Sequence, residues 1–221
     1  LKIALILRGI EKLKNKKLIF ATHNIGKIKE FEQLFSGIGI DFLNLSSFKI
    51  EDEPIENGLT FSQNAEIKLD YYFDRIKKSG FEYKPETYLM SEDSGIEIRY
   101  LNGAPGVKSA RYGGDITTKE RNELVLSKLK GVPKIERNAR YFCCIKVLNF
   151  FDEVKMEFTG KLDGYISKGS NDGDGFGYDP IFIPLGYNET ISKLGYDLKN
   201  AISHRSVAVE KMVNTIFRNE W

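Results

Sequence analysis

Apolar and polar positions follow one another along the chain in the two periods that distinguish strands from helices. An apolar run at residues 17–21 predicts a buried strand, a polar loop follows over 22–27, and apolar spacing predicts a helix over about 28–35. A helix that starts after a strand and a polar loop presents its first N–H groups. We therefore expect this junction to face an anion.

Three later helices have recognisable starts. Thr60 and Gln63 have the capping-box spacing, and apolar residues at helical spacing continue from there to a stop at Gly80. The same spacing opens a helix predicted over 117–130, and a last helix begins near Ser203.

The remaining apolar segments predict strands. Residues 88–90 are predicted to form a strand that ends in the polar segment 91–95, and alternation over 96–100 predicts that a strand continues there. The runs at 140–149 and 154–162 predict a hairpin. Helices that alternate with strands, together with a late hairpin, predict an α/β protein with a mixed sheet.

Composition narrows the classes of function. The 221 residues are 41% apolar, which suits one large domain or two intimate lobes with a sizeable core. The net charge is only +2, so no strong field attracts a polyanion, and a general nucleic-acid-binding protein is not expected. The apolar run at residues 2–8 is too short to span a bilayer. We expect residues 1–15 to be an N-terminal extension, a short extra helix or a targeting remnant.

The two cysteines, Cys143 and Cys144, are adjacent in a predicted strand. Neighbours on a strand point to opposite faces, so a disulfide between them would be strained, and two cysteines cannot supply a structural zinc site. We expect buried thiols in a reducing, cytoplasmic setting.

Phosphate chemistry is indicated first at residues 22–27. A hydroxyl, an amide, backbone N–H groups and an ammonium meet there at the start of a helix, although the P-loop pattern is absent. A solvated helix start is the alternative.

Two acidic segments, 51–56 and Glu92-Asp93, offer oxygen ligands for a metal. Mg²⁺ takes one or two carboxylates together with substrate phosphates. Asp93 is expected at a strand end, where a carboxylate could bind a metal or deprotonate water. An acidic loop that only aids solubility is the alternative for 51–56.

A flat ligand is indicated near the C-terminus. The ring of Phe176 can stack on a base, Asp179 can accept a hydrogen bond from a ring N–H, and Arg205 can donate to a keto oxygen. His204 and Arg205 fall in the first turn of a helix, where cations oppose the helix dipole, a cost that a bound ligand could offset. A capped helix with surface charges is the alternative. The turn at 103–106 dictates no chemistry.

Taken in this order, the segments resemble the inosine triphosphate pyrophosphatase family, house-cleaning enzymes for non-canonical purine nucleoside triphosphates. The matching segments are 21–27, 56–61 with 64–65, 92–95, 103–112, 175–182 and 202–205.

The resemblance implies an α/β fold with an elongated mixed β-sheet flanked by helices and two lobes around a deep nucleotide-binding cleft. Residues 16–221 would form a single pyrophosphatase domain of two lobes, preceded by the 1–15 extension. The enzyme would hydrolyse ITP, dITP and XTP to the nucleoside monophosphate and pyrophosphate and would require Mg²⁺. It would be a cytoplasmic homodimer whose partner is the nucleotide, not a nucleic acid or a membrane.

The resemblance also implies roles for individual residues. Asp93 would be the catalytic carboxylate, and Glu56 and Asp93 would bind the metal, with Glu53 close enough to compete. The nucleotide would be bound by Thr22, His23, Asn24, Ile25, Gly26, Lys27, Ser94, Phe176, Gly177, Tyr178, Asp179, Lys199, His204 and Arg205.

Two departures from the family leave questions open. Glu92 stands where bacterial relatives usually have Asp, so its role toward the metal is open, and the stretch 77–87 is longer than in compact relatives. Three other functions remain: a pyrophosphatase for modified pyrimidine nucleotides, a nucleotide-binding regulator without turnover, and a nucleic-acid-binding protein.

Overall fold

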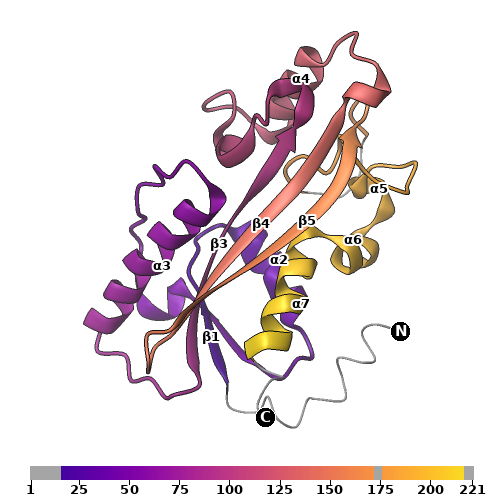
Figure 1. The fold of residues 1–221 in the computed structure, drawn as a ribbon. Helices are drawn as coiled ribbons and strands as arrows, with labels where there is room; N and C mark the ends of the chain where they lie inside the picture. The colour runs from indigo at the N-terminus through magenta and orange to yellow at the C-terminus, as the bar shows by residue number, and fades with distance from the viewer. Residues whose placement is uncertain (1–15, 172–175, 217–221) are drawn as a thin grey trace. The chain divides into compact units, whose positions relative to one another are not determined.

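The computed structural model describes residues 16–171 and 176–216, and the predicted 1–15 extension lies outside them. Within these residues the strands form one mixed sheet in the order β2-β1-β3-β4-β5-β6 (Figure 1). β1 pairs in parallel with β2 and β3, whereas β5 and β6 are antiparallel. This confirms the predicted α/β class and mixed sheet. The strands are Lys17–Phe20 (β1), Asp41–Asn44 (β2), Thr87–Ile98 (β3), Asn138–Asn149 (β4), Lys155–Ile166 (β5) and Phe182–Pro184 (β6).

Three helices, α3, α4 and α7, start where the sequence signals predict. Thr60 and Gln63 form the predicted capping box before α3, and Thr117 and Glu120 form another before α4. The α-helices are Ile25–Phe35 (α2), Phe61–Lys78 (α3), Thr118–Lys128 (α4), Ile191–Leu194 (α5), Tyr196–Ile202 (α6) and His204–Ile216 (α7). Short 3₁₀ helices are Leu45–Phe48 (η2), Arg99–Leu101 (η3), Gly106–Arg111 (η4) and Lys134–Glu136 (η5).

The chain divides into two compact units. The first unit takes the chain up to Asp93, residues 144–159 and the chain from Ala208 onward; the second takes residues 94–143 and 160–207. The division falls inside β3, β4, β5 and α7.

The core of the first unit gathers around the buried face of α3. The residues predicted from the helical spacing are buried there, and they pack against β1, β3 and the end of β4. The cluster contains Ile19, Ala21, Leu45, Leu69, Tyr72, Phe73, Ile76, Leu89, Leu148 and Phe150.

The core of the second unit includes the place where β5 meets β6. Gly164 on β5 lies so close to β6 that a Cβ atom there would stand 2.3 Å from the Ile183 carbonyl oxygen and 2.6 Å from the Phe182 ring. The strands can pair at this point because residue 164 has no side chain. The surrounding cluster includes Ile96, Ile98, Val125, Leu129, Tyr141, Ile166, Tyr178, Ile181 and Phe182.

Two predicted boundaries are wrong. The polar loop is shorter than predicted, because Asn24 caps α2 and its side chain accepts a hydrogen bond from the Lys27 N–H, so the helix begins at Ile25. Residues 91–95 do not end a strand, because β3 continues through them. Their polar side chains are compatible with a buried strand since neighbouring elements bind them; the Ser91 hydroxyl, for example, donates to the Ala65 carbonyl oxygen of α3.

The two cysteines lie buried on β4, as predicted. Burial raises the pKa of the Cys144 thiol to about 12, so this group stays protonated at neutral pH. Among the described residues, no helix has both the length and the apolar character needed to cross a bilayer.

Candidate active site

The segment predicted to bind phosphate forms the turn between β1 and α2. The Thr22 hydroxyl oxygen accepts from the Asn24 N–H at 3.2 Å, and the Asn24 side chain accepts from the Lys27 N–H at 3.0 Å. These two side chains therefore shape the turn itself. The groups available to a phosphate are the first N–H groups of α2, at Ile25 and Gly26, which have no acceptor within the helix.

Lys27 lies in the first turn of α2 and forms an ion pair with Glu92 on β3. Its Nζ atom is 2.7 Å from the Glu92 Oε2 atom, and the Glu92 side chain is fully buried. The pair connects the phosphate turn to the strand that carries Asp93. Because Glu92 holds the ammonium in place, it positions Lys27 for an anion at the helix start.

The two predicted metal carboxylates share one lysine. The Lys68 Nζ atom, on α3, is 3.2 Å from the Glu56 Oε1 atom and 3.3 Å from the Asp93 Oδ1 atom. The Asn64 amide nitrogen donates to the other Asp93 oxygen at 3.2 Å, and the Asn64 amide oxygen accepts from the Gly58 N–H at 2.8 Å. The Asn64 side chain thus connects the loop before α3 to β3.

The electrostatics around Asp93 favour a proton acceptor. Burial raises the pKa of Asp93 above its usual value, the positive charges of Lys68 and Lys27 oppose that rise, and the carboxylates of Glu92 and Glu56 add to it. A carboxylate whose pKa is raised is a stronger base than a solvated one, which suits a group that removes a proton from water.

Glu56 and Asp93 could bind a divalent cation whose remaining ligands would come from the substrate phosphates. Across residues 16–171 and 176–216, no three His, Cys, Asp or Glu side chains converge as a preformed cage. Two carboxylates around one shared ammonium nevertheless supply hard oxygen ligands, and Mg²⁺ is usually held by such a pair together with phosphate oxygens.

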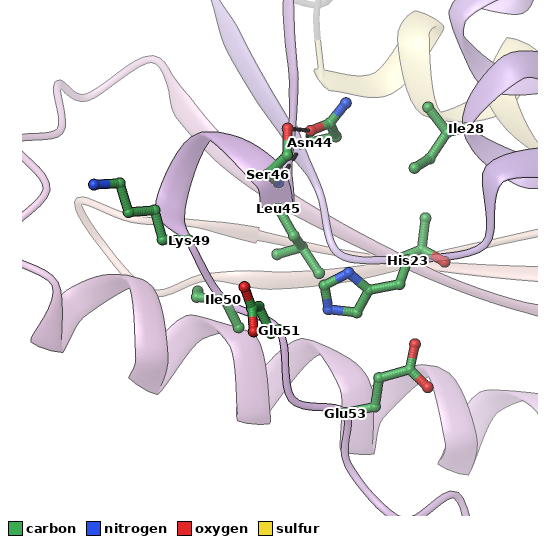
Figure 2. Close-up of a pocket in the computed structure, with 10 residues that line it drawn as sticks. His23, Ile28, Asn44, Leu45, Ser46, Lys49, Ile50, Glu51 and Glu53 are labelled. Atoms are coloured by element: carbon green, nitrogen blue, oxygen red, sulfur yellow. Dashed lines mark hydrogen bonds between the residues drawn. The ribbon is translucent and has the colours of Figure 1, made fainter.

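A pocket of about 680 Å³ in the first unit lies beside the phosphate turn (Figure 2). Thr22 and His23 line it together with Glu53, the competing metal carboxylate. The His23 ring lies edge-on to the Tyr72 ring, with centroids 5.9 Å apart. Glu53 thus lines this pocket, whereas Glu56 pairs with Lys68, the lysine that also contacts Asp93. The lining is Thr22, His23, Ile28, Asn44, Leu45, Ser46, Lys49, Ile50, Glu51 and Glu53.

In the second unit the predicted base-binding residues surround the buried carboxylate of Asp179. It accepts hydrogen bonds from the Phe176 N–H at 2.8 Å and from Lys199 Nζ at 2.9 Å. The Phe176 ring remains 40% exposed, which leaves it available for stacking. Asp179 therefore closes the turn that carries this ring.

Arg205 lies near the Phe176 ring. Its guanidinium donates to the Ser94 hydroxyl oxygen at 2.8 Å, and its central carbon is 6.0 Å from the centre of the Phe176 ring. Gly177 has a φ of +64°, a backbone conformation that favours glycine, and its carbonyl oxygen accepts from the Asn122 amide. Donors and an exposed ring thus occur together, as a flat ligand with a keto edge requires.

Tyr178 has a different environment from its neighbours. Its ring is buried in the core of the second unit, and its hydroxyl donates to the Ser109 carbonyl oxygen at 2.7 Å. The side chain thus anchors the turn in the core, and only the backbone of this residue is left to meet a ligand.

Comparison with known proteins identifies the family. The model of the Ham1 family matches residues 18–215. The chain belongs to the Ham1 family. The resemblance inferred from the sequence motifs is thereby confirmed.

Similar proteins span almost the whole chain. A dITP/XTP pyrophosphatase of Bacillus subtilis is 39% identical over 198 residues, covering 89% of this chain and 95% of the relative. One of Clostridium perfringens is 36% identical over 202 residues, covering 91% and 97%. The solved Ham1 protein of Coxiella burnetii has a TM-score of 0.77 at 33% identity and covers 92% of this chain and 99% of that one; the Ham1 protein of Staphylococcus aureus has a TM-score of 0.74 at 31% identity, covering 89% and 96%.

Within this Ham1-family chain, sequence reasoning missed several residues that hold the predicted ones. Lys68 and Asn64 bind Asp93, and Tyr141 and Asn122 contact Asp179 and Gly177. A signal was present for two of them, because Asn64 and Lys68 are four residues apart and interrupt the apolar face of α3. Nothing in the local pattern around Tyr141 or Asn122 distinguishes them from ordinary core residues.

Proposed function

We propose that this chain hydrolyses non-canonical purine nucleoside triphosphates, dITP, XTP and ITP, to the nucleoside monophosphate and pyrophosphate in the presence of Mg²⁺. Its family and its relatives named dITP/XTP pyrophosphatase make it a nucleoside triphosphate pyrophosphatase. The observation that carries the proposal is that the partly exposed carboxylate of Glu56 and the buried carboxylate of Asp93 meet around Lys68, because such a pair can supply metal ligands and a base for phosphoanhydride hydrolysis.

The chemistry assigned to the first unit is attack on the α-phosphorus. Asp93 accepts a proton from the attacking water, whose oxygen forms the new bond as the bond to the bridging oxygen of pyrophosphate breaks. Lys68 and Lys27 offset the charge that develops on the departing group, together with the N–H groups at the start of α2. Bound Mg²⁺ would supply further positive charge at the phosphates, with Glu56 and Asp93 as its protein ligands.

The role assigned to the second unit is selection of the base. Hypoxanthine and xanthine present a keto oxygen at position 6, whereas adenine presents an amino group there. A donor such as Arg205 donates a hydrogen bond to the keto oxygen of the first two bases but faces another donor, the amino group, in adenine. Each buried donor left without a partner costs about 1–3 kcal/mol, so two or three such mismatches would exclude ATP.

A pyrophosphate-release assay with a panel of nucleotides tests the proposal. The panel contains dITP, XTP, ITP, the four canonical purine triphosphates and modified pyrimidine nucleotides, each with and without Mg²⁺. We expect release from the first three only, and only with Mg²⁺. Preference for a modified pyrimidine would favour that alternative substrate, and nucleotide binding without turnover would favour a regulator.

The variant Asp93→Asn tests the catalytic assignment in the same assay. Loss of the base should reduce kcat by about 10²-fold or more while the nucleotide still binds. Asp163→Asn is the matched control, because Asp163 is an exposed carboxylate that pairs with Arg140 on the surface. Near-normal turnover by Asp93→Asn would reject the assignment.

We further propose that the enzyme is a cytoplasmic homodimer. The dimer comes from the family resemblance, and the cytoplasmic location comes from the resemblance and from the buried thiols. Light scattering of the purified chain should give twice the monomer mass of 25.2 kDa, and cell fractionation should place the enzyme in the cytoplasm. A monomer at micromolar concentration would contradict the proposed homodimer.

A further inference from the structure

Tyr141 connects two of the residues assigned to base selection, although no sequence motif includes it. It lies buried on β4, and its hydroxyl donates to the Asp179 Oδ1 atom at 3.2 Å. Its ring lies parallel to the His204 ring, with centroids 4.7 Å apart and an angle of 8° between the planes. Offset parallel stacking of this kind is a favourable arrangement of two flat rings.

The contact at Asp179 reaches further than one hydrogen bond. The same carboxylate accepts from Lys199 and from the Phe176 N–H, so Tyr141 is the third donor on the group that closes the Phe176 turn. Burial, and then the negative charge of Asp179, raises the pKa of Tyr141 well above its usual value. The hydroxyl therefore stays protonated and remains a donor at any working pH.

We propose that Tyr141 is a positioning residue for base selection, which fixes the plane of His204 through its ring and the Phe176 turn through its hydroxyl. This inference rests on the proposed function. The two contacts are separable, because a ring alone would hold His204 and a hydroxyl alone would hold Asp179. Tyr141 makes both, so one side chain links the carboxylate that closes the Phe176 turn to the His204 ring.

The ligand that this arrangement selects is a purine with a keto group at position 6. A ring that shifts by a fraction of an ångström misaligns the donors meant for the keto oxygen, while stacking tolerates the shift because every base has a flat face. Loss of Tyr141 should therefore reduce selectivity more than overall binding of purines.

Two variants separate the contacts in steady-state kinetics. Tyr141→Phe keeps the ring and removes the hydroxyl, and Tyr141→Leu removes both. For Tyr141→Phe we expect KM for dITP to rise about 10-fold or more, the effect of one hydrogen bond to a charged group, with kcat little changed. The kcat should persist because the carboxylates assigned to the phosphates belong to the first unit. The preference for dITP over dATP in kcat/KM should fall by a similar factor.

A second measurement does not depend on activity. The chain has two histidines, His23 and His204, so their ring-proton NMR signals are assigned by replacing one of them. The stacked Tyr141 ring should shift the His204 signals upfield. We expect Tyr141→Phe to retain this shift and Tyr141→Leu to lose it, with the His23 signals unchanged.

Tyr165→Phe is the matched control, because the Tyr165 hydroxyl also lies in the second unit and donates to the Tyr187 carbonyl oxygen. It should leave KM, selectivity and the His204 signals as in the wild type. The inference is overturned if Tyr141→Phe has the wild-type KM and selectivity, or if the His204 signals do not move in a folded Tyr141→Leu protein. A wild-type protein that hydrolyses none of the nucleotides overturns the proposed function and this inference with it.

Discussion

Lys68 brings a positive charge into the buried face of α3, at a position where the helical spacing calls for a hydrophobic residue. Its side chain is nearly inaccessible, and it is held by the carboxylates of Glu56 and Asp93. Burial of an ammonium is costly unless it is paired, and the same holds for each carboxylate. The three groups are therefore stable together and unstable apart.

Lys68→Met should destabilise the first unit and change catalysis. The buried carboxylate of Asp93 and the partly exposed carboxylate of Glu56 would lose their shared cation, so we expect the free energy of unfolding in urea to fall by about 3 kcal/mol. The pKa of Asp93 should rise further, because Lys68 is the strongest of the charges that hold it down, and the acidic limb of the pH–rate profile should move to higher pH.

The control for this change is Lys77→Met. Lys77 is exposed and pairs with Glu153 on the surface, where such a pair contributes less than about 1 kcal/mol. Equal stability of the two variants would show that Lys68 does not compensate the buried charges.

At the scale of elements, α3 is connected to β4 and β5 by a network of charges. Glu66 on α3 pairs with Lys146 on β4 at 2.9 Å and with Lys155 on β5 at 2.6 Å. Asp70, one turn later, pairs with Lys155 as well, and Glu157 pairs with Lys146. Each lysine thus bridges two carboxylates, and the network holds the helix that carries Asn64 and Lys68 against the hairpin.

Glu66→Gln should reveal this network through the pH dependence of stability. Burial alone would raise the pKa of Glu66, but hydrogen bonds from Lys155 and Lys146 outweigh it and hold the pKa below the usual value. A carboxyl group whose pKa falls on folding contributes stability above its unfolded pKa, about 4.3, and loses the contribution as pH falls through the lower folded value.

We therefore expect the wild type to exceed Glu66→Gln in free energy of unfolding by about 0.5–1 kcal/mol at pH 7, since the pairs are partly exposed. The difference should shrink on acidification below about pH 4. Urea denaturation at the two pH values measures it. Glu82→Gln, a change in an exposed loop, is the control, and a difference for Glu66→Gln that is independent of pH would contradict the role of its charge.

Over the whole molecule, the elements that were predicted correctly are those that local apolar spacing and capping residues determine. The helices with capping boxes, the hairpin and the mixed sheet all follow from local signals, and α3 was placed to within two residues of its end. The prediction failed at 91–95, where polar residues suggested the end of a strand. That segment is a strand because Asn64, Lys68 and Lys27 bind its side chains, and these partners are distant in sequence.

The site shows the same division between local and distant information. Motifs named the groups that would meet a nucleotide, but not those that hold them, such as Lys68 or Tyr141. A residue that supports another is recognised by a contact across the fold. The helical spacing marks Lys68 only as a polar interruption of an apolar face, and the strand pattern does not mark Tyr141 at all. Asp179 illustrates this, because its motif predicted an acceptor for the base and the structure shows three donors from the protein itself.

Gly164 has a consequence for how this sequence can vary. Any methyl group or larger substituent at that position would clash with the backbone of β6, the strand that follows the Phe176 turn in the chain. Every other amino acid at position 164 would therefore force the two strands to shift apart, although the glycine carries no functional group. The proposed selection of non-canonical purines would then depend, in part, on the absence of a side chain at position 164.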